Sequence, residues 1–271
     1  MIFVKGYGQM CNNILQYAHA YAFGREYGIK VVSMRFAYKY RYFALCGKGY
    51  HKPIVYLLAK LLIALKAVKP FYVAEPEDNT PALQKTLRKR SFSIIDGWHF
   101  RFPELFMKYA GDIRKLFTFN PQITEKVSNE IKTFSGEADL CVAVHVRRGD
   151  YINWLGGIYY FEDDVYIRNI RDFLQAFPDK KIAVFIATND RRLSVDAYRS
   201  ALGTERIFCL KHNEAEDLCM LSLCDYIIGV RSTFSLVASF LKNRPLYWIP
   251  DKDTPLKLEK FSSFEQEFRT V

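Results

Sequence analysis

Short apolar runs alternate with stretches of helical periodicity from about residue 139 onward. The apolar runs are rich in β-branched residues and cover 141–147, 182–188, 206–210, 226–230 and 246–249. Helical periodicity covers the intervening stretches 163–177, 191–202, 214–224 and 233–242. Apolar strands separated by helices are typical of a parallel sheet that is covered on both faces. The pattern predicts a Rossmann-like domain, whose ligands bind beyond the carboxyl ends of the strands.

The first part of the chain follows the same alternation less regularly. MIFVK and IKVVSM predict strands on either side of a helix from about Asn12 to Tyr27. SFSIIDGW predicts a further strand, followed by the helices of FPELFMKYAGDIRKLF. We therefore expect an α/β domain over 1–125 and a second, Rossmann-like domain over 126–271. Their linker is expected near 119–138, with a cleft between the domains, an architecture that suits an enzyme with two substrates.

Charge is distributed unevenly between the two halves. Residues 1–120 contain 19 Lys and Arg against 7 Asp and Glu, whereas the remainder contains 20 against 22. Half of the 271 residues are apolar and 16% are aromatic, which excludes intrinsic disorder. Because all the excess positive charge lies in the first half, the two regions are expected to meet different partners.

The segment PIVYLLAKLLIALKAVKPF, residues 53–71, is nearly long enough to span a bilayer. Lys60, Lys66 and Lys69 interrupt it at spacings that place them roughly on one side of a helix. Two interpretations are open: an amphipathic helix lying on a membrane surface, and a buried helix whose lysines extend to solvent.

Residues 35–52 interleave five basic residues with the aromatic side chains of Phe36, Tyr38, Tyr40, Tyr42, Phe43 and Tyr50. Such a mixture is typical of single-stranded nucleic-acid binding, which is the non-enzyme alternative. It suits a mobile loop facing anionic lipid or a sugar acceptor equally well. Nucleic-acid binding by this segment does not explain the polar residues that follow the predicted strands after residue 139, so we expect no nucleic-acid partner.

The six cysteines form no CxxC pair and no cluster with metal-ligand spacing. The opening MIFVKGYGQ has Lys5 and two glycines where a signal peptide requires its apolar core. We therefore expect reduced thiols, no metal and no cofactor, in a cytoplasmic protein. Peripheral contact with the anionic inner face of a membrane is an additional expectation from the basic first half.

The segment CVAVHVRRGDY ends an apolar strand with two arginines. Alternation places His145 and Arg147 on the same side of the strand and turns Arg148 away. Arginine grips phosphate oxygens through paired, charge-assisted hydrogen bonds. Asp150 is a candidate to orient a guanidinium or to act as a base. The alternative is a salt bridge between Arg148 and Asp150 that only closes a loop.

Three further segments reach the same edge of the predicted sheet. Ser232 and Thr233 stand where a helix begins, and a helix N-terminus offers N–H groups to phosphate. Ordinary N-capping by Ser232 is the alternative. Thr188 and Asp190 end the strand of VFIATND. Asp217 begins a helix, either as a first-turn acid or as an acceptor for the N–H groups of a purine. Together these segments indicate a pyrophosphate site.

The order HVRRGDY, ATND and DLCMLSLCDYIIGVRSTFS resembles the fucosyltransferases that use GDP-fucose, in particular the α-1,2-fucosyltransferases of glycosyltransferase family 11. GQMCNNILQYAHAYAFG and DGWHFRFPELFMKYAGDIRKLFTF are similar to segments of the same family. The resemblance implies a GT-B fold of two Rossmann-like domains, in which 1–125 is the acceptor-side domain and 126–271 is the nucleotide-sugar-binding domain. It also implies inverting, metal-independent transfer of fucose to a hydroxyl, the galactose 2-OH of a galactoside-containing glycan. A lipid-linked glycan would suit the basic first domain.

The resemblance further implies roles for individual residues. Arg147 would hold the β-phosphate of GDP, His145 would contact the nucleotide near its base and ribose, and Asp217 would accept the guanine N–H groups. The other donor-binding candidates are Arg148, Thr188, Asp190, Ser232, Thr233, Gly8, Asn12 and Asn13. The candidate base is Asp150, with Glu162, Asp163 and Asp164 as alternatives. The acceptor-side candidates are the aromatic residues Tyr151, Trp154, Tyr160 and Phe234.

Some positions depart from the pattern of the family. They are Cys11, Asn13, Asn189, Leu236 and Val237. The residues expected on the donor phosphates are kept, whereas the walls near the sugar and the acceptor are altered. The class of reaction is therefore better supported than the linkage or the acceptor, and another nucleotide sugar is the alternative donor.

Overall fold

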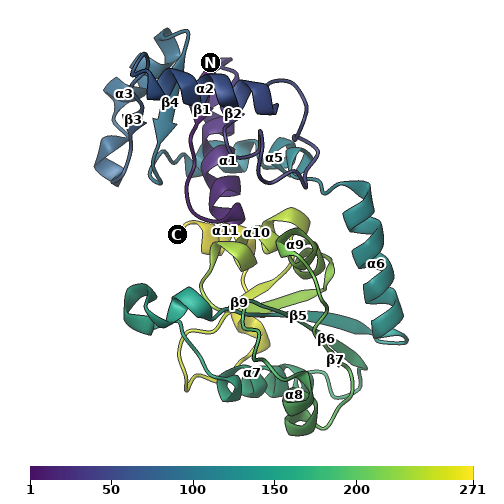
Figure 1. Cartoon of the computed structure of the whole chain (residues 1–271). Coiled ribbons are helices and arrows are strands. Elements are labelled where there is room, and N and C mark those ends of the chain that lie inside the picture. The colour runs from purple at the N-terminus through teal and green to yellow at the C-terminus, as the bar shows by residue number, and fades with distance from the viewer. Residues whose placement is uncertain (271) are drawn as a thin grey trace. The chain divides into compact units, whose positions relative to one another are not determined.

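The computed structural model describes residues 1–270, which form two compact units. The first unit is Met1–Asn120 and the second begins at Pro121 (Figure 1). The expected boundary between residues 125 and 126 therefore falls inside a helix, α6 (Pro121–Ser135), and the expected linker at 119–138 is mostly helical. Residues 119–138 resemble a linker in sequence because α6 is largely polar and buries little besides Val127.

The first unit contains a four-stranded parallel sheet in the order β2-β1-β4-β3. The strands are β1 (Ile2–Val4), β2 (Val31–Ser33), β3 (Phe71–Tyr72) and β4 (Ser93–Asp96). The helices are α1 (Met10–Tyr27), α2 (Pro53–Ala64), α3 (Pro81–Lys89), α4 (Pro103–Lys108) and α5 (Ala110–Leu116). Most of α1 is buried, which explains why its sequence is apolar on several sides.

The second unit contains a five-stranded parallel sheet in the order β7-β6-β5-β8-β9. The strands are β5 (Leu140–Val146), β6 (Ile182–Thr188), β7 (Ile207–Phe208), β8 (Tyr226–Gly229) and β9 (Leu246–Trp248). The helices that follow α6 are α7 (Asp163–Gln175), α8 (Val195–Leu202), α9 (Glu214–Leu223), α10 (Thr233–Lys242) and α11 (Phe264–Phe268). The prediction of an α/β fold with two parallel sheets is confirmed.

Helices cover both faces of the second sheet, as its apolar strands require. Figure 1 shows α7 and α8 on one face and α9 and α10 on the other. Val142, Val144 and Val146 share a hydrophobic core with Tyr166 of α7 and Tyr198 of α8. The intervening odd-numbered positions of β5 face α9 and α10. This alternation decides which residues at the strand's end meet which helix.

Residues 35–52 were interpreted as a surface that binds single-stranded nucleic acid or as a mobile loop, and the burial of several of their aromatic side chains disagrees with both interpretations. Phe36, Tyr40 and Phe43 of the basic aromatic segment lie in the core. The rings of Phe36 and Phe43 pack against Phe117, and the ring of Tyr40 packs against Phe36. Buried rings cannot stack on bases, so the segment is not a nucleic-acid platform built from these residues. It is also a packed loop, because Phe43 pairs with Phe119 as an isolated bridge.

The apolar segment 53–71 is shorter as a helix than expected. Its helix, α2, ends at Ala64, and Lys66 has a left-handed backbone with φ of 55°. Lys66 and Lys69 therefore follow the helix and do not lie along one side of it. Ala59 is the one residue of α2 that is fully buried, so the interpretation as a buried helix is wrong. Among residues 1–270, no helix combines the length and apolarity needed to cross a bilayer.

Candidate active site

The carboxyl ends of β5 and β8 meet at the centre of the second sheet. The chain reverses its direction of strand addition between these two strands, which is where ligands bind in sheets of this kind. His145 of β5 pairs directly with Gly229 of β8. A Cβ atom on Gly229 would lie 3.1 Å from that of His145, so glycine allows the close approach. Sequence reasoning missed Gly229, although a glycine inside the strand YIIGV was a signal.

His145 is a buried imidazole at this junction. Its side chain faces α10, where its ring centroid lies 4.9 Å from that of Phe234. Burial, assisted by the charge of Arg147, lowers the pKa of His145 to about 3. The ring is therefore neutral at physiological pH. Its Nδ1 is buried and has no hydrogen-bond partner among the described residues, which is unusual for a buried polar atom.

Arg147 follows on the same side of the strand and is only partly exposed. Its Nη2 lies 2.6 Å from Oδ1 of Asp150, and its guanidinium lies 5.4 Å from the ring centroid of Tyr151. The alternative pairing of Arg148 with Asp150 is thus wrong. Because the Asp150 side chain is 66% exposed, its pair with Arg147 is weak and a phosphate can replace it.

Arg148 turns to the opposite face and is buried. Its guanidinium donates hydrogen bonds to Asp163 at 2.5 Å, to Asp190 at 3.1 Å and to the carbonyl oxygen of Phe161 at 3.1 Å. Burial lowers the pKa of Arg148, but the hydrogen bonds to the two carboxylates outweigh it and raise the pKa overall. Arg148 and Asp190, both predicted to bind the donor, are therefore hydrogen-bonded to each other and stabilise the loop after β5.

The loop after β5 is also fastened to the end of β6. The side chain of Asn189 accepts a hydrogen bond from the backbone N–H of Arg148 at 2.8 Å and donates one to its carbonyl oxygen at 3.2 Å. Gly149 has φ of +61°, and a Cβ there would lie 2.8 Å from Nδ2 of Asn189. Thr188 accepts a hydrogen bond from the N–H of Asp190 at 3.0 Å. Asn189 and Gly149 position the arginines, which sequence reasoning did not foresee.

The first turn of α10 lies beside this loop. Ser232 caps the helix by accepting a hydrogen bond from the N–H of Phe234 at 3.2 Å, as the capping alternative predicted, and Thr233 begins the helix. The hydroxyl of Tyr151 donates to the carbonyl oxygen of Arg231 at 3.0 Å. This bond connects the loop of Arg147 to the start of α10, so the two elements form one group.

Asp217 lies in the first turn of α9, beside His212. The two side chains approach to 3.4 Å, and His212 also contacts Glu130 of α6 at 2.8 Å. Burial raises the pKa of Asp217, and its proximity to His212 only partly opposes this. The carboxylate is 19% exposed, which leaves it accessible to a ligand.

In the first unit, the glycine loop lies at the carboxyl end of β1. Gly8 has φ of +74°, and a Cβ there would lie 2.6 Å from Nδ2 of Asn12. Asn13 is buried and its amide donates to the carbonyl oxygens of Tyr7, Gly8 and Gln9. Asn13 therefore shapes the loop from inside, whereas Gly8 is exposed.

The acceptor-side candidates fall into two environments. Tyr151 is buried, Tyr160 is partly buried, and Phe234 packs against His145. Trp154 is 42% exposed, and its ring centroid lies 4.7 Å from that of Tyr151. Only Trp154 thus presents a large aromatic surface to solvent.

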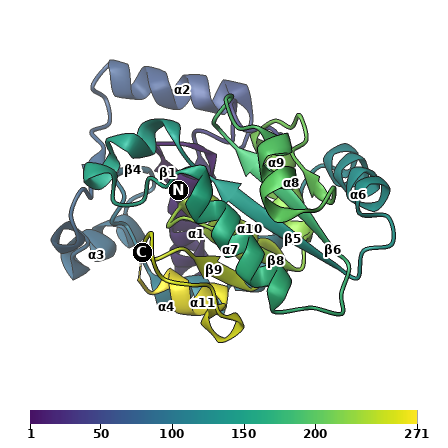
Figure 2. The same cartoon turned by 90° about the horizontal axis from the view of Figure 1, so that it is seen from below.

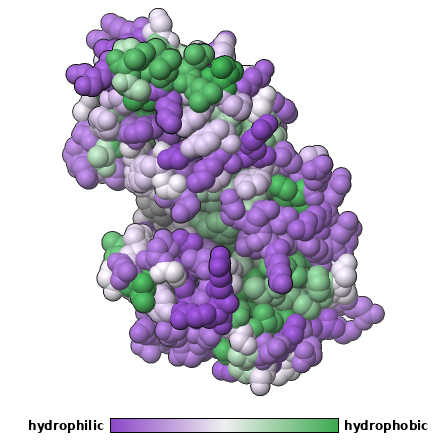
Figure 3. Space-filling view, in the orientation of Figure 1, coloured by the Kyte–Doolittle hydropathy of each residue, from purple (hydrophilic) through white to green (hydrophobic). Residues whose placement is uncertain are grey.

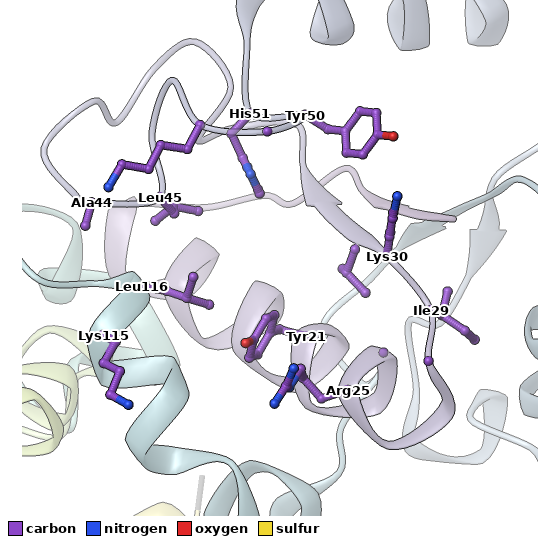
Figure 4. A pocket seen from close by; sticks show the side chains of 15 residues that line it. Tyr21, Arg25, Ile29, Lys30, Ala44, Leu45, Tyr50, His51, Lys115 and Leu116 are labelled. Carbon is purple, nitrogen blue, oxygen red and sulfur yellow. The ribbon is translucent and has the colours of Figure 1, made fainter.

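A cavity of about 580 Å³ lies within the first unit, away from these residues. Figure 4 shows its lining, with Arg25, Lys30 and Lys115 around an apolar floor that includes Leu45 and Leu116. The cavity opens near the amino end of β2, whereas ligands of such sheets bind at the carboxyl ends. Arg25 is already paired with Asp112 at 3.1 Å. We therefore place the candidate site at the second sheet.

Residues 1–270 contain no group of three or more His, Cys, Asp or Glu side chains arranged to hold a metal ion, and the six cysteines are free. The two α/β units with parallel sheets have a GT-B-like fold. Residues 39–265 match the family described as Glycosyl transferase family 11, and the chain belongs to that family.

Solved structures share this fold at low sequence identity. A mutant of Arabidopsis thaliana FUT1 in complex with GDP has a TM-score of 0.65 and 13% identity, covering 97% of this chain and 73% of that chain. POFUT1 in complex with GDP-fucose has a TM-score of 0.57 and 13% identity, with 90% and 93% covered. NodZ α-1,6-fucosyltransferase soaked with GDP-fucose has a TM-score of 0.56 and 13% identity, with 96% of each chain covered. The chain matches none of the curated proteins with which it was compared.

Proposed function

We propose that this protein transfers fucose from GDP-fucose to a glycan hydroxyl by an inverting, metal-independent reaction. The observation that carries the proposal is the junction of β5 and β8, where Arg147, His145 and the first turn of α10 lie together. Membership in glycosyl transferase family 11 supports the class of reaction. The names of the three similar structures, which hold GDP or GDP-fucose, support the donor.

In this proposal, the second unit stabilises the departing GDP. As the bond between fucose C1 and the phosphate oxygen breaks, negative charge builds on the β-phosphate. Arg147 exchanges its exposed partner Asp150 for this phosphate, and the N–H groups of α10 add their partial positive charge. Pre-placed cations and dipoles act most strongly in the transition state, because they need no rearrangement there. The neutral ring of His145 contacts the nucleotide through Nδ1.

The acceptor hydroxyl forms the new bond to fucose C1 on the face opposite the phosphate, and its proton passes to a base. We propose Asp150, because the phosphate frees its carboxylate from Arg147. Asp163 is a weaker candidate, since it already accepts hydrogen bonds from Arg148 and from Tyr198 at 2.7 Å. Glu162 and Asp164 are exposed and stay alternatives.

For the acceptor, we propose the galactose 2-OH of a galactoside-containing glycan, which gives an α-1,2 linkage. Membership in family 11 supports this choice, and the exposed ring of Trp154 suits a sugar face. We propose that the reaction occurs in the cytoplasm, on a glycan under assembly. Another nucleotide sugar is the second candidate donor.

The first test measures GDP-fucose turnover with a galactoside acceptor, and competition by GDP, UDP and dTDP. Arg147→Ala should lose at least about 2 kcal/mol of binding or transition-state energy, roughly thirtyfold. Arg171→Ala, an exposed arginine on α7, is the matched control and should behave as wild type. Removing divalent cations with EDTA should leave the rate unchanged. If UDP or dTDP competes better than GDP, the donor is wrong.

Base recognition is tested separately at Asp217. Asp217→Ala should weaken GDP by about tenfold while leaving the weak affinity for UDP unchanged, because only guanine presents matching N–H donors. An equal loss for both nucleotides would mean that Asp217 supports the fold through His212 and not the base.

A further inference from the structure

The outer face of α2 and its cap is apolar. The exposed residues are Ile54, Leu57, Leu58, Leu61 and Leu65, each between 53% and 68% exposed. At 3.6 residues per turn, these positions fall within an arc of about 100°. Figure 3 shows apolar side chains gathered over α2, and Figures 1 and 2 show the helix along the outside of the first unit. They form a continuous stripe, which we call the α2 stripe.

The α2 stripe is additional to the face that the helix buries. Val55, Ala59 and Ile63 contribute to a hydrophobic cluster with Val32 and Ile94 of the sheet. A surface helix of a soluble domain normally turns one apolar face to the core and polar residues outward. Because the core contact of α2 is already made, its stability does not require the α2 stripe. Exposed apolar patches of this kind mark an interaction surface.

The charge around the α2 stripe is of one sign. Residues 27–74 contain nine Lys and Arg and no Asp or Glu. Lys52 precedes α2, Lys60 lies on its flank, and Lys66 follows its end, all exposed. The Lys60 ammonium lies 5.9 Å from the ring centroid of Tyr56. An apolar stripe bordered by cations is the composition of a helix that lies in a membrane interface.

We propose that α2 binds the surface of an anionic phospholipid membrane, with the α2 stripe among the upper acyl chains and the lysines at the phosphates. Charge complementarity selects this occupant. A second copy of the chain would bring another nine cations and no acids from the same segment against the first, which opposes self-association. The proposal goes beyond fucosyl transfer and does not depend on it.

The test measures partition of the full-length protein into vesicles of phosphatidylcholine with phosphatidylglycerol, and into phosphatidylcholine alone. Wild type should bind the anionic vesicles, and salt should weaken this binding because exposed charges are screened. Leu57→Ser combined with Leu61→Ser should weaken partition about tenfold or more, because both side chains leave the acyl layer. Its melting temperature should equal that of wild type, since neither leucine is buried.

Leu155→Ser is the matched control, because Leu155 is 59% exposed but belongs to the second unit. It should bind vesicles as wild type does. Equal loss in this control, or full binding by the double variant, would overturn the proposal. So would a wild-type dimer in light scattering that the double variant converts to a monomer, because the α2 stripe would then be an interface between copies.

Discussion

Replacing Arg148 with methionine removes a cation that is only 6% exposed and that two carboxylates share. The variant loses three hydrogen bonds, of 2.5, 3.1 and 3.1 Å. It also leaves Asp190, itself 7% exposed, without its buried counter-charge. Breaking a buried ion pair by removing one partner costs about 3–5 kcal/mol. Arg148→Met should therefore lower the free energy of unfolding by about this amount.

Arg147→Ala is the matched comparison, since it removes the same group from the adjacent residue. Its partner Asp150 is 66% exposed, and exposed ion pairs contribute about 0–1 kcal/mol. Arg147→Ala should therefore leave stability nearly unchanged and still lose about thirtyfold in affinity for GDP. Urea unfolding followed by circular dichroism, with calorimetric titration of GDP, measures both quantities.

Two results would refute this division of roles. One is that Arg148→Met unfolds as wild type does but no longer binds GDP. Arg148 would then contact the nucleotide, and its buried hydrogen bonds would not stabilise the fold. If Arg147→Ala is as destabilised as Arg148→Met, the pair with Asp150 is structural, and Arg147 is not held ready for a phosphate.

Two further predictions follow from local geometry. Gly149→Ala should lower the free energy of unfolding by about 1–2 kcal/mol because of the positive φ, and by a further amount because the new Cβ would contact Asn189. Gly203→Ala, with φ of +64° and open space around it, should lower it by the first amount alone. Equal losses in thermal unfolding would contradict the contact. Burial lowers the pKa of His51 to about 4, so its contribution to stability is complete above about pH 6.5 and falls as pH drops toward 4. Between pH 7 and 5, wild type should lose about 2 kcal/mol more than His51→Gln, which can still accept the N–H of Ser33. Urea unfolding at both pH values measures this, and parallel losses would refute it.

The second unit was largely predictable because its strands are apolar on both faces and its helices have a regular period. The strands at 182–188, 226–230 and 246–249 agree with the structure to within a residue or two. The helix predicted at 191–202 begins later, at Val195, because Asp190 closes a turn with Arg192 first. A local hydrogen bond of this kind leaves no trace in hydrophobic periodicity.

The candidate site was predictable as a location but not as a set of contacts. Chain order and the rule for strand ends were enough to bring His145, Arg147 and Ser232 to one edge. The partners of Arg148 could not be predicted from the sequence, because Asp163 and Asp190 lie 15 and 42 residues away along the chain. Sequence spacing carries no information about which distant side chains meet.

The sequence by itself determined the alternation of strands and helices, the edge of the sheet at which His145, Arg147 and Ser232 lie, and the resemblance to a glycosyltransferase family. Each depends on local periodicity or on residues that are near one another in the chain. Tertiary structure alone decided that Arg148 is buried and Arg147 is not, that Phe36 and Phe43 are core, and that one face of α2 has no partner within its unit. Burial depends on what the rest of the chain packs against each side chain, and packing joins residues that the sequence keeps far apart.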